Sequence, residues 1–169
     1  MAKNWRISSI SGALLAVYFI PAWAMVAFST MISPIHALYE RPNISFALFA
    51  SDHMQLAGMA TVRFGWLLAL VRITVVAFFA LFLLFITRAS IRKSGGCNEA
   101  LAMAIEIGGV ISFAGVLTAS LAGETAALRM HAAELLMMLG TGIVMLVEGP
   151  VQPQADHSTA SGELSLQQT

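Results

Sequence analysis

Charged side chains are scarce in this sequence. Asp, Glu, Lys and Arg make up 11% of the 169 residues, whereas a soluble domain carries roughly 25%. The nine basic and nine acidic residues cancel, so the chain has neither a basic field for nucleic acid nor an acidic tail. These shortages exclude a nucleic-acid-binding protein and indicate that water is not the main solvent of the chain.

Cysteine and histidine are also few. Cys97, in a polar segment, is the sole cysteine, which excludes an internal disulfide, a CxxC redox pair and a thiolate metal cluster. Only His131 among the histidines falls within a long apolar run, so a haem held by two histidines from neighbouring spans lacks a second ligand. We expect no metal and no cofactor, with a membrane quinone as the one group left open.

Long apolar runs, in contrast, dominate the chain, which is 58% hydrophobic. About 20 largely apolar residues suffice for a membrane-spanning helix, and four segments qualify: 10–32, 64–86, 101–121 and 125–147. A secretory signal peptide is the alternative for the first run, but its length favours an uncleaved span. The sequence therefore predicts an all-α integral membrane four-helix bundle over residues 1–150.

The segments between the spans predict the topology. A loop of about thirty residues, with a short interfacial helix over 44–50, separates the first two spans on the outer side, and the polar tail 151–169 is expected to be disordered. Positive charges gather at one end of the predicted bundle (Lys3, Arg6, Arg88, Arg92 and Lys93, against Arg41, Arg63 and Arg129 at the other). The positive-inside rule then favours a bacterial inner-membrane protein with both termini in the cytoplasm.

Four ionisable residues within or near the spans form a predicted polar cluster. Ionisable groups at membrane depth are costly, and they indicate a functional site or a buried pair. Arg72 and Glu134 lie roughly 12 and 14 Å below the outer ends of their spans, His131 shares a helix face with Glu134, and Arg129 lies at the outer boundary. The cluster has two interpretations: an ion pair between Arg72 and Glu134 that fixes helix register, or a ligand or proton site.

The third predicted span carries one carboxylate and a stripe of small residues. Glu106 lies near the inner end, where it can reach interfacial water or the basic connector. The small residues recur on one helix face, at Gly108, Ser112, Gly115 and Ala119. Such a stripe permits close approach of another helix, so we interpret it as a packing surface.

The segment from Arg129 to Gly140, RMHAAELLMMLG, is similar to one in the DoxX-like superfamily of small four-helix membrane proteins. The stress-associated branch of that family has an arginine followed five positions later by an acid, then Leu-Met and a glycine. Arg129 and Glu134 are the positions that match. Leu128 and Ala133 depart from the family pattern, which has a glycine and a lysine there. The resemblance implies a helper role at the membrane in redox or stress physiology.

Three functions remain open for such a chain. The first is a non-enzymatic accessory protein or membrane subunit. The second is a small oligomeric transporter or proton-linked carrier, because four helices seldom enclose a pathway alone. The third is a quinone- or lipid-binding subunit of a membrane enzyme, which predicts a lateral opening between the second and fourth spans. The expected partners are the lipid bilayer and either further copies of the chain or a larger membrane complex.

Overall fold

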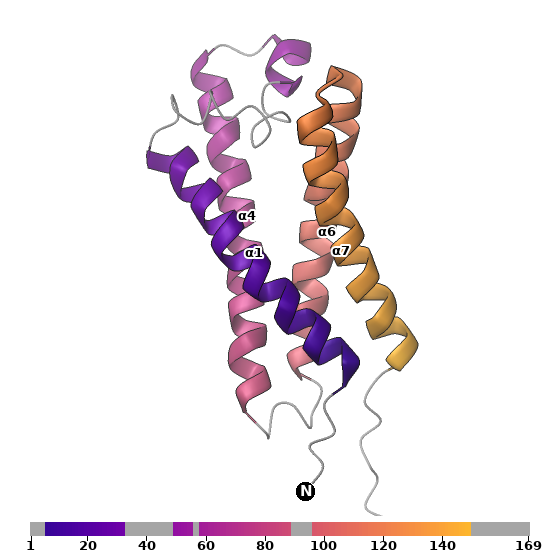
Figure 1. The fold of residues 1–169 in the computed structure, drawn as a ribbon. Coiled ribbons are helices and arrows are strands. Elements are labelled where there is room, and N and C mark those ends of the chain that lie inside the picture. The colour runs from indigo at the N-terminus through magenta and orange to yellow at the C-terminus, as the bar shows by residue number, and fades with distance from the viewer. Residues whose placement is uncertain (1–5, 33–48, 56–57, 89–95, 150–169) are drawn as a thin grey trace, which may run out of the picture.

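A computed structural model describes residues 6–32, 49–55, 58–88 and 96–149. Four long helices pack as a bundle (Figure 1): α1, Ile7–Ile32; α4, Gly58–Thr87; α6, Gly96–Ala122; and α7, Thr125–Glu148. Each is long and apolar enough to cross a membrane. The described part of the chain is therefore all-α and contains four candidate membrane spans.

The observed helices are longer than the expected spans. α4 begins at Gly58 rather than Phe64, and α6 begins at Gly96 rather than Leu101. As a result Cys97 lies in the first turn of α6 and is buried in the hydrophobic core, not in a polar connector. A short helix is described over 49–54, and most of the predicted helix 44–50 lies outside the described residues. Most of the predicted loop and the tail 151–169 lie outside the described residues.

The helices follow one another around the bundle. α1 packs on α4, α4 on α6, and α6 on α7, and a smaller contact between α7 and α1 completes the circuit. Figure 1 shows that α1 crosses the bundle obliquely. The C-terminal end of α1 lies beside α4, and the N-terminal end of α1 approaches α7. Because of this crossing, side chains from all four helices can meet in the interior.

A tight turn sets the register of α6 against α7. Gly123 has a φ of 71°, a left-handed conformation that glycine adopts without a steric penalty. The Glu124 N–H bonds to the Ala119 carbonyl and the Gly123 N–H to the Ser120 carbonyl, which is the Schellman arrangement at a helix C-terminus. Residues at equal distances before and after this turn therefore face each other across α6 and α7.

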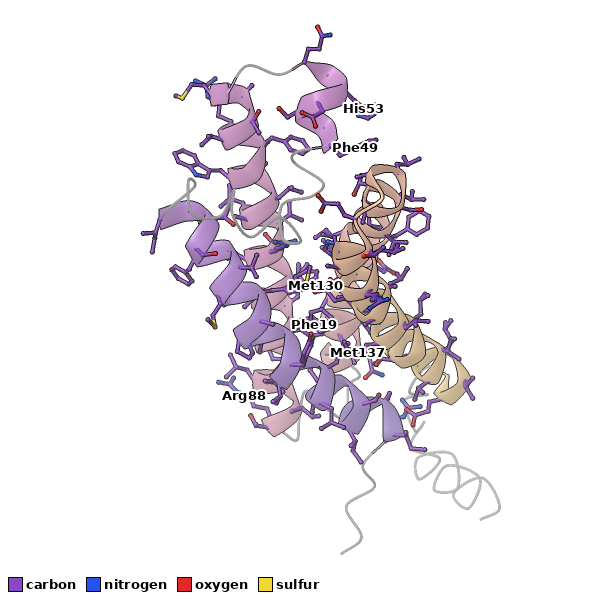
Figure 2. The ribbon with its side chains drawn as sticks, turned by 45° about the horizontal axis from the view of Figure 1, so that its top comes forward. Phe19, Phe49, His53, Arg88, Met130 and Met137 are labelled. Carbon is purple, nitrogen blue, oxygen red and sulfur yellow. The ribbon has the colours of Figure 1, made fainter. Side chains whose placement is uncertain are left out.

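Aromatic side chains fill the centre of the bundle. Phe19, Phe79 and Phe82 have no exposed surface, and Figure 2 shows Phe19 where α1 crosses the other helices. The Phe19 and Phe79 rings stack with centroids 5.7 Å apart, and Trp23 meets Phe19 edge to face at 5.1 Å. These contacts hold the Trp23 indole inside the bundle.

The first and last helices cap each other at one end of the bundle. The Glu148 carboxylate, on α7, accepts hydrogen bonds from the N–H groups of Ile7 (2.6 Å) and Ser8 (3.2 Å) at the start of α1. Arg6 in return donates to the main-chain carbonyls of Glu148 (2.7 Å) and Gly149 (3.0 Å). The negative charge of Glu148 lies at the N-terminus of α1, and the positive charge of Arg6 lies at the C-terminus of α7. Each charge complements the dipole of that helix end. We call this arrangement the Arg6–Glu148 clasp.

Candidate functional site

Three helices donate hydrogen bonds to one carboxylate, that of Glu134 on α7. Its Oε1 accepts from Nε1 of Trp23 on α1 (2.8 Å), and its Oε2 accepts from the hydroxyl of Ser112 on α6 (3.3 Å). Oε2 also lies 3.0 Å from Nδ1 of His131, one turn earlier on α7. All four side chains are buried. The cost of placing a carboxylate in this interior is therefore offset by three donors.

The position of Glu134 follows from the sequence periodicity of α7. The buried residues of this helix recur every three or four positions, and they are Ala127, His131, Glu134, Met138 and Thr141. This is the spacing of the inner face of a helix in a bundle. His131 and Glu134 thus take two core positions that an apolar residue would ordinarily fill.

Arg72 on α4 brings the fourth helix to this group. Its side chain is buried, and its Cζ lies 5.8 Å from the centroid of the Trp23 ring, within the range of a cation–π contact. Arg72 and Glu134 also attract each other electrostatically. One interpretation of the sequence pairs these two residues directly. The hydrogen-bond partners of Glu134 in the structure are Trp23, Ser112 and His131.

Trp23 and Ser112 therefore have roles that the sequence does not indicate. In the sequence, Ser112 is a member of the small-residue stripe, and Trp23 lies in an apolar run with no local motif. The signal that could have found Trp23 is its depth. It lies about 14 Å from the outer end of α1 at 1.5 Å per residue, close to the estimated depth of Glu134.

Two other expected site residues lie apart from this group. Arg129 and Glu106 are both exposed on the outside of the bundle. Arg129 is two residues from His131, and Glu106 is two residues from Gly108. Two residues turn an α-helix by about 200°, so both side chains project away from the buried faces of their own helices. The polar cluster of the structure is consequently Arg72, His131 and Glu134 with Trp23 and Ser112, without Arg129.

The stripe of Gly108, Ser112, Gly115 and Ala119 is buried in α6. Its described contacts are mainly with α7, and Val75 of α4 also lies near Gly108. A Cβ atom at Gly108 would lie 2.7 Å from Cε of Met138, and one at Gly115 would lie 2.6 Å from Cδ2 of His131. Gly115 thus provides the space that the imidazole ring occupies. The stripe thus makes room for the His131 ring as well as for the close packing of α6 and α7.

A cavity of about 200 Å³ adjoins the polar group, between α4 and α6. Its walls are mostly aliphatic (Leu68, Val71, Val110, Ile111 and Ala114), and Arg72, Gly115 and His131 complete the lining. Val110 is 69% exposed and Val71 38% exposed, so the cavity meets the outer face of the bundle there. The opening lies between the second and third spans, whereas a quinone- or lipid-binding subunit predicts one between the second and fourth.

Replacing Gly115 by alanine should destabilise the protein, because the new methyl group would meet the imidazole of His131 at 2.6 to 3.0 Å. The ring cannot move away without straining its bond to Glu134. We expect a loss of about 1–3 kcal/mol in the free energy of unfolding, measured by circular dichroism during thermal unfolding in detergent. Gly109→Ala is the matched control, since a Cβ there meets nothing within 4 Å. Equal unfolding temperatures for the two variants would contradict this account of Gly115.

No group of three or more metal-ligating side chains occurs within the described ranges. No protein-family model, curated protein or solved structure matches the chain. The chain is a small multi-pass membrane protein with four candidate spans, built around a buried polar group.

Proposed function

We propose that this protein binds a small amphipathic molecule, of the quinone or lipid class, that enters from the membrane between α4 and α6. One observation carries the proposal: a mainly aliphatic cavity of about 200 Å³ is bordered by two buried ionisable side chains, Arg72 and His131. An apolar cavity of about 150 Å³ is large enough to hold a benzene molecule. The cavity therefore suits a single ring or a comparable head, with any tail extending past Val110 into the lipid.

This arrangement matches the general pattern of small-molecule sites. Such sites are concave and mostly apolar, with a few polar groups that orient the ligand. Ionisable residues inside a membrane span are themselves indicators of function. A ligand-binding role also fits the expectation of an accessory protein or subunit, whereas the DoxX-like resemblance and the redox or stress role that it implies stay predictions.

Purification in a mild detergent tests the proposal. Mass spectrometry of extracts should detect a stoichiometric lipid or quinone with the wild-type chain. Ala114→Phe should abolish it, because Ala114 lines the cavity and the larger side chain would fill it. Leu117→Phe is the matched control, since Leu117 is exposed on the same helix outside the cavity. A wild-type chain without a bound small molecule, or equal amounts in wild type and Ala114→Phe, would overturn the proposal.

The buried pair of His131 and Glu134 favours a second candidate, a proton-linked carrier. The two groups are 3.0 Å apart, and both change charge on protonation. In this case, vesicles containing the wild-type protein would show proton flux that Glu134→Gln abolishes. An absence of flux from wild-type vesicles would exclude the carrier.

We further propose that both termini face the cytoplasm of a bacterial cell. Arg6 and Arg88 lie at one end of the bundle and the helix 49–54 at the other, and Figure 2 shows Arg88 and His53 at opposite ends of the molecule. Cys97 is 3% exposed and is a poor labelling site, so Cys97→Ala provides the background. In that background, Met54→Cys should react with an impermeant maleimide on intact cells, and Arg88→Cys should react only after permeabilisation. The reverse pattern would contradict this orientation.

A further inference from the structure

The hydrogen bond between His131 and Glu134 fixes the chemistry of the imidazole. Nδ1 of His131 lies 3.0 Å from Oε2 of Glu134. A carboxylate only accepts hydrogen bonds, so Nδ1 must carry the proton. In a neutral imidazole the other nitrogen, Nε2, is then an acceptor with a free lone pair. The same carboxylate also accepts hydrogen bonds from Trp23 and Ser112.

The second nitrogen of this ring reaches open space. Within the described part of the chain, the one hydrogen bond of the His131 ring is that of Nδ1. Nε2 therefore has no hydrogen-bond partner among the described residues, and the protein does not enclose it fully. Since His131 is 3% exposed and lines the cavity between α4 and α6, the open space that Nε2 reaches is this cavity.

Gly115 and Glu134 hold the imidazole in this position. A Cβ at Gly115 would lie within 3.0 Å of Cδ2, Cγ and Nδ1 of the ring, so the ring lies directly on the backbone of α6. The bond to Glu134 prevents rotation about the side chain. The acceptor in the cavity wall is therefore preorganised, which reduces the entropy lost when a ligand binds.

We propose that the ligand of this cavity carries a hydroxyl group on an apolar body, as a phenol or hydroquinone does, and that this hydroxyl donates a hydrogen bond to Nε2 of His131. The inference rests on the proposed function and specifies the ligand class. Arg72 lines the same cavity, and its guanidinium has only donors. A hydroxyl complements both residues because it donates through its hydrogen and accepts through its oxygen.

A matched pair of probes tests the inference. 4-Butylphenol and 4-butylanisole share an apolar body, but the anisole has no hydroxyl hydrogen. Calorimetry with the full chain in mild detergent should show at least about tenfold weaker binding of the ether, because a buried acceptor without a donor costs about 1.4 kcal/mol or more. Ala114→Phe should abolish binding of both probes, which locates them in the cavity.

His131→Asn separates the two nitrogens of the ring. An asparagine amide can still donate to Glu134 from near the position of Nδ1, but it has no group at the position of Nε2. We expect phenol affinity to fall to that of the ether, while ether affinity stays unchanged.

The outcomes distinguish the two proposals. Equal affinity of the wild-type chain for phenol and ether, with both blocked by Ala114→Phe, would overturn the hydroxyl assignment and leave the cavity as a ligand site. Failure of both probes to bind the wild-type chain would count against the cavity as a ligand site and would overturn both proposals. Because the comparison of probes uses the wild-type chain, it remains decisive even where His131→Asn does not fold.

Discussion

Replacing Glu134 by leucine should remove a large part of the stability of the bundle. The change leaves three buried donors, on Trp23, Ser112 and His131, without their common acceptor. Removing one partner from a buried charged network typically costs about 3–5 kcal/mol. We expect a loss of this size in the free energy of unfolding, measured by denaturant titration of the purified protein in detergent micelles.

Two further variants calibrate this result. Met138→Leu changes the next buried position of α7 with little change in volume, so it should cost less than about 1.5 kcal/mol. Glu134→Gln keeps the shape of the side chain and one acceptor oxygen, so its loss in the free energy of unfolding should lie between those of Glu134→Leu and Met138→Leu. If Glu134→Leu proves as stable as Met138→Leu, the carboxylate does not organise the bundle.

Exchanging the charges of Arg72 and Glu134 should not restore stability. Both single variants, Arg72→Glu and Glu134→Arg, should unfold at markedly lower denaturant concentration than wild type. In the double variant, an arginine at position 134 would face the indole N–H of Trp23 and the hydroxyl of Ser112. A guanidinium cannot accept their hydrogen bonds. The loss of stability in the double variant should therefore be about the sum of the losses in the two single variants.

A double-mutant cycle measures this directly. The coupling free energy is obtained from the unfolding of wild type, the two single variants and the double variant. A coupling that recovers most of the lost stability would mean that the attraction between Arg72 and Glu134 dominates. Negligible recovery would show that the donors around Glu134 determine its role.

Much of the architecture could be predicted from the sequence. Helix number and approximate helix bounds depend on the length and polarity of apolar runs, and these are local properties. The contact of His131 with Glu134 is also local, since side chains three positions apart lie on one face of a helix. The stripe from Gly108 to Ala119 likewise indicated a face of α6 that another helix approaches closely.

The partners of Glu134 on other helices could not be predicted in the same way. The bond from Trp23 depends on the angle at which α1 crosses the bundle, which no pattern within α1 specifies. The clasp is similar, because Arg6 and Glu148 belong to opposite ends of the chain. The placement of Arg129 was different: its angular position relative to His131 excludes it from the inner face of α7, and this followed from helix geometry alone.

The Arg6–Glu148 clasp also constrains how the bundle is assembled during synthesis. The first amide groups of α1 find their acceptor on a residue 141 positions further along the chain. At the usual rates of translation, roughly 7–28 s separate the synthesis of Ile7 from that of Glu148. Until Glu148 is made, the first amide groups of α1 lack the carboxylate that caps them, so they need water or lipid phosphate as acceptors. The helix made last among the four described, α7, is thus the one that closes the bundle.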